Sequence, residues 1–393
     1  MLLYDSIKML QAGSHKMKKN IITNISSSSS GLASVSEGKF YFDAKNHVFS
    51  IGGITHPDEN NNEYYRLNAF EKDKYSETNR ALGDHTSGGS VRFVTDAKEF
   101  YLKVTMRSAS TGMQHFPNRG AYGFDVYIGS GKNRQYRGNM MQMMTDPHGF
   151  EDTVTLPEGE NEVMIELPLY GGISELLIGF PEGATVSKAP DRAIAPVAFY
   201  GSSITQGGCV SRPGNMYSNI ICRKLDCDCL NLGFSGSAFG EQSIAEYLAG
   251  RDFSAFVMDY DYNARSLEEL QNTHSEFYKT VRTAHTEEPI IIVSHPYYAA
   301  ESEGDIKRKN ILRETYRKAI ANEENVYFVD SETFFPLEMR DLFAVDNLHP
   351  NSLGHYFMYK AIMPTLKKAL EVVVSSLRGE GIEPSGEVSQ PES

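Results

Sequence analysis

Ser203 lies in a loop of small residues, GSSITQGG at positions 201–208, that directly follows an apolar run at 197–200. The apolar run predicts a buried strand, so the loop would hold a serine hydroxyl on a rigid element. Such a hydroxyl becomes a nucleophile when a neighbouring base takes its proton. The loop alone is weak support for catalysis, because serine and glycine also fill ordinary turns and helix caps.

A carboxylate and an imidazole stand three residues apart near the other end of the chain, as Asp346 and His349 in the stretch DNLHP. In a turn the two side chains can meet. The carboxylate would then fix the tautomer of the ring and stabilise its charged form. Together with a serine, the pair would supply the parts of nucleophilic acyl transfer.

Two further loops offer hydrogen-bond donors. The stretch NLGFSGS at 231–237 contains Gly236, whose bare backbone allows an amide N–H to approach a ligand closely. The stretch DYDYN at 259–263 ends in Asn263, which offers a neutral side-chain donor. Both kinds of donor can hold an oxyanion. Taken separately, each loop fits a turn or a helix cap at least as well.

Other polar and aromatic residues follow the same predicted strands. His295 could contact substrate or act as a rival base, although a structural role has more weight. Four tyrosines cluster there, namely Tyr260, Tyr262, Tyr297 and Tyr298. Their rings could stack on sugars or pack into the core. Tyr262, His295 and Tyr297 are the candidate substrate contacts. His115 and Arg119, in a loop of the N-terminal half, could reach the neighbouring site, but a solvated loop has more weight.

The C-terminal half alternates predicted strands with predicted helices. The strands are at 197–200, 229–232, 255–260, 290–294 and 326–329, and the helices at 217–225, 242–248, 266–283, 305–321 and 352–377. This pattern predicts an α/β fold with a flavodoxin-like, doubly wound parallel sheet of five strands. Ligands bind outside the carboxyl ends of such strands, which is where the candidate residues lie.

The N-terminal half reads as short strands separated by turn residues, which predicts an all-β sandwich or jelly roll. The expected strands are at 38–42, 90–93, 99–106, 123–128, 150–156, 161–167 and 175–180. We therefore expect a flexible N-terminus at 1–37, a β-sandwich accessory domain at 38–190, a catalytic domain at 191–377 and a disordered tail at 378–393. The flexible segment includes a polyserine run at 26–30.

The four candidate loops, in this order and each after its strand, resemble the four sequence blocks of the SGNH (GDSL-like) hydrolases. The resemblance implies that Ser203 is the nucleophile, that His349 is the general base and that Asp346 orients it. It also implies an oxyanion hole formed by the amides of Ser203 and Gly236 and the side chain of Asn263. No metal or cofactor is implied.

Two positions depart from the family pattern. Ser202 stands where the family usually has Asp before the nucleophile, and Asp261 and Ala264 flank the third block where it usually reads Gly-x-Asn-Asp. The stretch GFDVY at 123–127 is similar to the Gly-x-Asp-Leu-Tyr stretch of a subfamily with an N-terminal β-domain, and 85–93 looks like another part of that module.

The amino-acid composition limits the classes of molecule that the protein could bind. Lys and Arg total 38 against 51 Asp and Glu, a net charge of −13 without a basic patch, which argues against nucleic acid and anionic membranes. The cysteines, Cys209, Cys222, Cys227 and Cys229, lack the spread of a disulfide framework and the spacing of a metal site, so we expect free, buried thiols. Without a recognisable export signal, we expect a cytoplasmic protein.

The function that these features favour is a serine esterase acting on short acyl groups, most readily a carbohydrate O-acetylesterase. This step rests on analogy between folds. The expected partner is a small or oligosaccharide ester, and an exposed sandwich face could also mediate a homo-oligomer. A lipid-directed esterase or thioesterase and a glycan-binding protein with an inactive hydrolase domain remain as alternatives.

Overall fold

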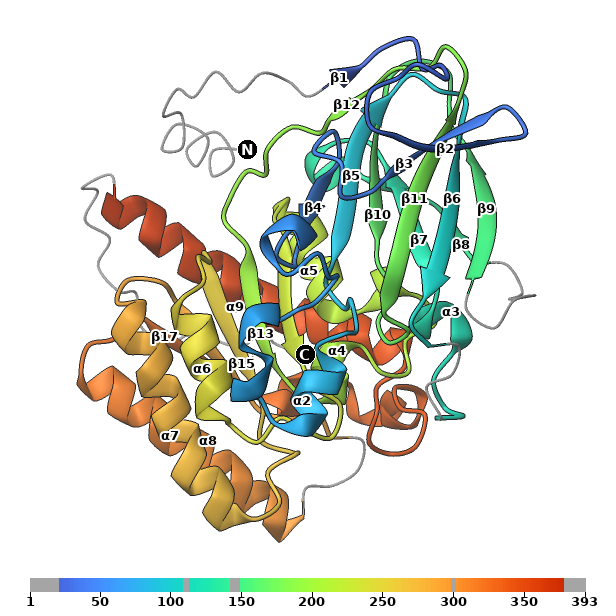
Figure 1. Cartoon of the computed structure of the whole chain (residues 1–393). Helices are drawn as coiled ribbons and strands as arrows, with labels where there is room; N and C mark the ends of the chain where they lie inside the picture. Colours follow the sequence, from blue (N-terminus) through green and yellow to red (C-terminus); the bar gives the residue numbers. More distant parts are fainter. Residues whose placement is uncertain (1–20, 109–112, 142–148, 298–301, 378–393) are drawn as a thin grey trace.

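The computed structural model describes residues 21–108, 113–141, 149–297 and 302–377, with side chains up to residue 371. Expectations for residues 1–20, for Tyr298 and for the tail at 378–393 lie outside these residues. Figure 1 shows a β-rich N-terminal part beside an α/β C-terminal part. None of the helices in the described ranges has the length and hydropathy needed to span a membrane.

The N-terminal part is a sandwich of two antiparallel sheets. One sheet has the order β1-β12-β5-β10-β7-β8, with β4 also paired to β5. Its strands are β1 (Ile21–Ile22), β4 (Ser50–Gly52), β5 (Ser90–Thr95), β7 (Phe124–Ile128), β8 (Gln135–Met140), β10 (Asn161–Glu166) and β12 (Val186–Lys188). The other sheet has the order β2-β3-β11-β6-β9. Its strands are β2 (Leu32–Ser36), β3 (Lys39–Asp43), β6 (Glu99–Met106), β9 (Gly149–Thr155) and β11 (Ile173–Pro181).

The sandwich core is made by alternate residues of both sheets. Phe124 and Val126 of β7 are fully buried, and they join aromatic residues such as Phe93, Phe100 and Phe180 in one continuous cluster. Each strand expected from the sequence is present with small shifts at its ends. The strands that the sequence did not indicate are short or largely exposed, as β2 and β8 are. Such strands show little hydrophobic alternation.

The segment at 21–37 differs from the expectation of a flexible N-terminus. β1 pairs with β12 and β2 pairs with β3. Between them, Ile25 is fully buried, and the amide of Ser26 donates to the hydroxyl of Ser29 at 3.0 Å. The polyserine run therefore forms a turn whose hydroxyls satisfy its own backbone, and the neighbouring isoleucine fastens it to the core.

The C-terminal part is a five-stranded parallel sheet with the order β14-β13-β15-β16-β17. The strands are β13 (Val197–Gly201), β14 (Cys229–Gly233), β15 (Ala255–Asp259), β16 (Ile290–Val293) and β17 (Val326–Val329). This is the flavodoxin-like order, so the predicted fold class is confirmed.

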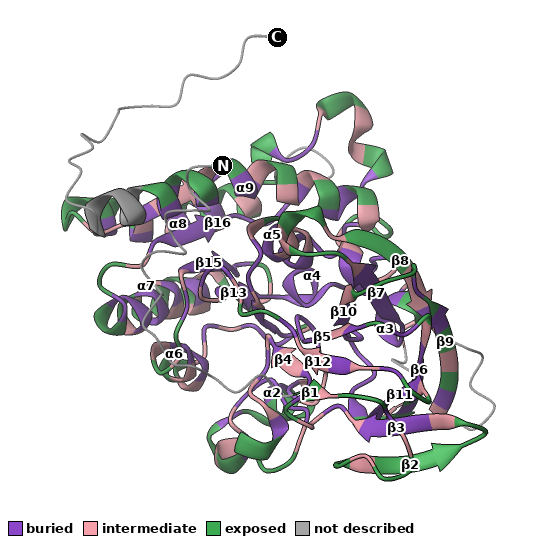
Figure 2. Ribbon diagram, turned by 90° about the horizontal axis from the view of Figure 1, so that it is seen from above, coloured by how far each residue is buried: buried purple, intermediate pink, exposed green. Residues whose placement is uncertain are grey.

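Helices cover both faces of this sheet (Figure 1). Helices α6 (Gln242–Ala249), α7 (Leu267–Ala284) and α8 (Glu303–Ala321) pack on one face, and α5 (Tyr217–Leu225) and α9 (Ser352–Leu377) pack on the other. Figure 2 shows the strands buried and the outer faces of these helices exposed. Consequently Val197 and Phe199 of β13 join one core cluster, while Ala198 and Tyr200 join the other.

The described residues also form three short α-helices, namely α2 (Glu77–Leu82), α3 (Asn118–Ala121) and α4 (Ser203–Gln206). The two parts are joined by Arg66, which is fully buried between them. Its guanidinium donates to the carbonyls of Asn231 at 3.1 Å and Gly233 at 2.7 Å, at the end of β14. The N-terminal part thus supports the edge of the sheet that carries the candidate residues.

Candidate active site

Ser203 is the first residue of α4, directly after β13. The hydroxyl of Ser202 caps this helix by accepting from the amide of Ile204 at 3.2 Å, and Gly207 ends it in the left-handed region at φ 99°. Serine caps a helix about as well as aspartate, so the departure at Ser202 keeps the local geometry. The turn fixes Ser203 at the carboxyl end of β13, an interior strand of the sheet, with 7% of its surface exposed.

Asp346 and His349 meet because the chain forms a tight turn before α9. Ala344 and Pro350 form a β-bridge, and the amide of Val345 donates to the carbonyl of His349 at 3.0 Å. Asn347 takes the left-handed conformation at φ 61°, which asparagine tolerates better than most residues. The turn therefore brings a carboxylate and an imidazole onto one side of the backbone.

The three residues form a continuous hydrogen-bonded chain. Oγ of Ser203 lies 2.9 Å from Nε2 of His349, and Nδ1 of the same ring lies 2.8 Å from Oδ2 of Asp346. Burial raises the pKa of Asp346, but hydrogen bonds from the amide and ring of His349 outweigh it and hold this pKa below its usual value. The carboxylate is thus ionised at neutral pH and accepts the Nδ1 proton, which leaves the Nε2 lone pair toward the serine.

The predicted oxyanion donors lie on the two adjoining loops. Gly236 has φ 65°, and open space surrounds the position where a Cβ would stand. The amides of Ser203 and Gly236 have no hydrogen-bond acceptor among the described residues. Oδ1 of Asn263 accepts from the amide of Ala238 at 3.4 Å, so Nδ2 remains as a donor.

The N-terminal part reaches this site, which the sequence had left open as the lesser alternative for His115. Phe116 packs its ring 6.0 Å from that of His349 and 4.6 Å from that of Tyr170. Nε2 of His115 lies 4.0 Å from Oδ2 of Asp346. The expectation of a solvated loop is therefore wrong for His115, because the loop folds against the Asp346–His349 turn. Arg119 instead bonds Asn139, away from the turn.

Gln206 connects the serine loop to the Gly236 loop. Its Oε1 accepts from the amide of Ser235 at 2.9 Å, and its Nε2 lies 2.8 Å from Nδ1 of His85. Burial lowers the pKa of His85 to about 3, so this ring is neutral and accepts the amide proton. Both residues lie in stretches that the sequence singled out, but nothing in their spacing indicated that they meet.

The GFDVY stretch holds the loop that follows α4. Oδ2 of Asp125 accepts from Arg212 at 2.6 Å and from the amide of Gly214 at 2.7 Å. The hydroxyl of Tyr127 accepts from the same arginine at 2.8 Å. Asp125 is fully buried, so this ion pair holds the loop after α4 firmly against the sandwich.

The three predicted substrate contacts differ in exposure. Tyr262 is 42% exposed, whereas His295 and Tyr297 are buried. Nδ1 of His295 lies 2.6 Å from Oδ2 of Asp261, and its Nε2 lies 3.4 Å from Oδ1 of Asp305. The imidazole therefore lies between two carboxylates, and only Tyr262 offers a substantial surface.

All four cysteines are free and buried, as expected. Cys209 lies close to His115 and His349. These three residues are the only group of possible metal ligands at the described part of this site. Burial, with a smaller contribution from Asp346, raises the pKa of Cys209 to about 12. The thiol is thus protonated at neutral pH and is a poor metal ligand in this state.

The geometry defines a class of protein: a parallel α/β sheet with a Ser–His–Asp chain at its carboxyl edge, next to a β-sandwich. Comparisons agree with this class. Residues 194–367 match the model of the GDSL-like lipase/acylhydrolase family, and residues 40–186 match the N-terminal domain of SGNH-hydrolase-type esterases, GxDLY. Residues 194–367 are therefore a domain of the GDSL-like lipase/acylhydrolase family, and residues 40–186, on its N-terminal side, are a GxDLY domain.

Solved structures share this fold at low sequence identity. A protein from Bacteroides ovatus, classed as a GDSL-like lipase, is 24% identical with a TM-score of 0.76, covering 85% of this chain and 98% of that one. The salicylyl-acyltransferase SsfX3 of a tetracycline biosynthetic pathway is 13% identical with a TM-score of 0.70, covering 86% and 99%. A family two carbohydrate esterase from Cellvibrio japonicus is 14% identical with a TM-score of 0.55, covering 85% and 98%. No curated protein matches the chain significantly.

Proposed function

We propose that this protein is a serine esterase that removes short acyl groups, acetyl above all, from hydroxyls of a carbohydrate. The observation that carries the esterase proposal is the hydrogen-bonded chain from Ser203 through His349 to Asp346. A serine in this arrangement, beside unpaired amides, has the parts that acyl transfer needs.

The chemistry follows from the contacts. His349 takes the proton of Ser203 as Oγ attacks the ester carbonyl, while Asp346 stabilises the imidazolium that forms. The amides of Ser203 and Gly236 and Nδ2 of Asn263 hold the oxyanion. The ring then gives its proton to the leaving alcohol, and the acyl group stays on Ser203. Water, deprotonated by His349, releases the acid by the same steps.

Two features support a small acyl group on a sugar. Phe116 and Tyr170 form an aromatic wall beside His349, which limits the space next to the serine. The exposed ring of Tyr262 on the Asn263 loop offers a face on which a sugar can stack. The similarity in fold to a family two carbohydrate esterase agrees with this substrate class. Retention of all three Ser–His–Asp residues argues against a binding protein with an inactive hydrolase domain.

The direct test is hydrolysis of para-nitrophenyl acetate, butyrate and octanoate, followed by release of acetate from acetylated xylan. We expect acetate to be preferred, xylan to be deacetylated and Ser203→Ala to lose turnover of every ester. Full activity in Ser203→Ala would refute the nucleophile, and preference for octanoate would favour a lipid-directed esterase. Cleavage of the aryl ester without action on xylan would refute the carbohydrate part of the proposal.

A further inference from the structure

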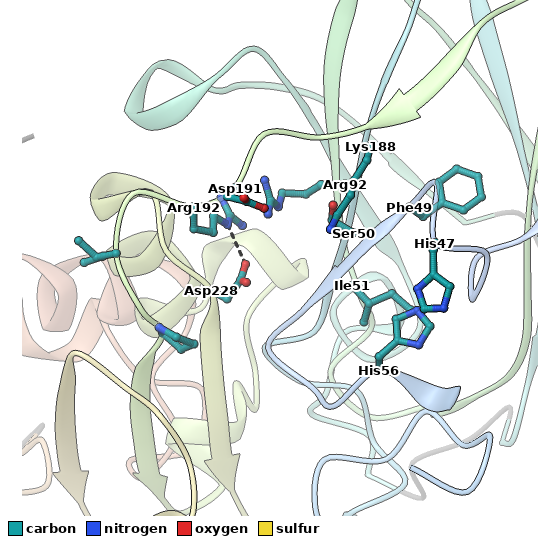
Figure 3. A pocket seen from close by; sticks show the side chains of 12 residues that line it. His47, Phe49, Ser50, Ile51, His56, Arg92, Lys188, Asp191, Arg192 and Asp228 are labelled. Atoms are coloured by element: carbon teal, nitrogen blue, oxygen red, sulfur yellow. Dashed lines mark hydrogen bonds and ion pairs between the residues drawn. The ribbon is translucent and has the colours of Figure 1, made fainter. Parts of the chain in front are cut away.

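Two histidines and an aspartate converge beside the short strand β4. His47 precedes the strand, and His56 and Asp58 follow it, at the start of the 3-10 helix η1 (Pro57–Glu59). The two imidazoles are stacked, with centroids 4.8 Å apart and planes 17° apart. Figure 3 shows both rings together at one side of a pocket between the two parts of the chain.

The three potential ligand atoms lie close together. Nε2 of His47 is 3.3 Å from Oδ2 of Asp58, and Nδ1 of His56 is 3.8 Å from the same oxygen. All three atoms lie within 4.8 Å of one another. Tetrahedral zinc, with bonds of about 2.0–2.2 Å, needs ligand atoms roughly 3.3 Å apart. Small rotations of the side chains would bring this group to that geometry.

We propose that His47, His56 and Asp58 bind a divalent transition metal, zinc above all, with water as the fourth ligand. Two neutral imidazoles and one carboxylate form a donor set that suits this ion. The adjoining pocket of about 300 Å³ is lined by both histidines, so it has room for the water.

The carboxylates of Asp58, Glu59 and Asp43 lie near the ring of His56 and would attract a cation there. Nδ1 of this ring accepts only a long bond of 3.4 Å from the amide of Asp58, which a metal would replace.

The other nitrogen of the His56 ring, Nε2, is buried and has no hydrogen-bond partner within the described ranges. Because Nδ1 accepts from the amide of Asp58, the proton of the neutral ring is on Nε2, and coordination through Nδ1 would keep it there.

A metal here would join the two flanks of β4, which is packed against the catalytic part. A Cβ on Gly52 would lie 2.4 Å from the carboxylate of Asp228, and one on Gly53 would lie 2.7 Å from the carbonyl of Cys229. These contacts are at the amino end of β14, whereas Ser203 follows the carboxyl end of β13. The metal is therefore expected to stabilise the contact between the two parts without entering the reaction.

The test uses the full chain, freed of metal with a chelator and titrated with zinc in competition with a chromophoric chelator. We expect one site in the wild type, weakened at least about tenfold in His47→Gln and in Asp58→Asn. Asp73→Asn changes another exposed aspartate and should bind as the wild type does. Zinc should raise the melting temperature of the wild type and of Asp73→Asn, and should leave that of Asp58→Asn unchanged.

The visible absorption spectrum of the cobalt-loaded protein would identify the metal ligands. At the proposed site, cobalt should give the visible bands of a tetrahedral ion without a thiolate charge-transfer band. A thiolate band, with loss of para-nitrophenyl acetate hydrolysis, would assign the metal to His115, Cys209 and His349 and overturn the proposal. Equal zinc binding by all variants, or none by the wild type, would overturn it too. Asp58 is largely exposed, so Asp58→Asn remains a usable variant even if His47→Gln fails to fold.

Discussion

Two Asp–His pairs lie at the same edge of the parallel sheet, and their surroundings differ. In the first pair, His349 is 2.8 Å from Asp346, and its other nitrogen faces the neutral hydroxyl of Ser203. In the second pair, His295 is 2.6 Å from Asp261, and its other nitrogen faces a second carboxylate, Asp305. A short Asp–His contact therefore does not by itself identify a general base.

The second partner decides what each ring can do. Burial lowers the pKa of His295, but the negative charge and hydrogen bond of Asp261, helped by Asp305, outweigh it and raise this pKa above its usual value. The two carboxylates favour the charged form of this ring, which joins the Asn263 loop to α8. His349 faces a hydroxyl instead, so it can accept a proton there.

The largest expected effect is a loss of kcat when the imidazole of His349, but not that of His295, is replaced by a neutral amide. We expect His349→Gln to lower kcat for para-nitrophenyl acetate roughly 10⁴-fold or more, because nothing else takes the serine proton. His295→Gln should keep kcat within about tenfold and lower the melting temperature instead. Steady-state kinetics and thermal unfolding of both variants provide the measurement. The opposite ranking of the two kcat values would make His295 the base.

Replacing the carboxylate of each Asp–His pair tests the same comparison in a second way. Asp346→Asn should lower kcat about 10⁴-fold with little change in stability, because the amide no longer fixes the tautomer of His349. Asp261→Asn leaves the charged, buried His295 without its main partner and should cost about 3–5 kcal/mol in the free energy of unfolding. Urea unfolding at pH 7 checks this, and equal stability of the two variants would contradict it.

A smaller catalytic effect is expected from the loop that His295 supports. Asn263→Ala removes one proposed oxyanion donor and should lower kcat about 10²- to 10³-fold, with a smaller change in KM. Tyr262→Ala, on the same loop, provides the matched control and should change KM for a sugar ester more than kcat. An unchanged kcat in Asn263→Ala would place the oxyanion elsewhere.

The smallest effect is a pH dependence of stability. Because the pKa of His295 is raised on folding, its contribution to stability is fully present below the unfolded value of about 6.5 and is lost as pH rises through the folded value. The advantage of the wild type over His295→Gln should thus shrink as the pH rises from about 6.5 through the higher folded-state pKa of His295. Burial raises the pKa of Asp259 to about 7, and the charge of His295 acts to lower it, so the difference also contains a smaller contribution from Asp259. A growing advantage would contradict the raised pKa.

The sequence predicted the parallel sheet well, because its strands are apolar runs and its helices are long and periodic. It also indicated Ser203, Gly236, Asn263 and the Asp346–His349 pair, since each directly follows a strand or precedes the last helix. It gave less weight to His115 reaching the site and did not single out Phe116, because the place of both residues depends on how two distant parts of the chain pack.

The sequence favoured a structural role for His295 but did not indicate which residues surround it. Its position after β16 resembled that of a residue at the active edge, and nothing near it in the sequence indicated the two carboxylates. Asp261 and Asp305 come from different segments and meet the ring only through tertiary packing.

The central claim is that His349 activates Ser203, and labelling with an alkyl fluorophosphonate followed by mass spectrometry tests it most directly. We predict one adduct in the wild type, located on Ser203, labelling as fast in His295→Gln, and labelling slowed by orders of magnitude in His349→Gln. An adduct on another residue, or equal labelling rates in His349→Gln and the wild type, would contradict the account.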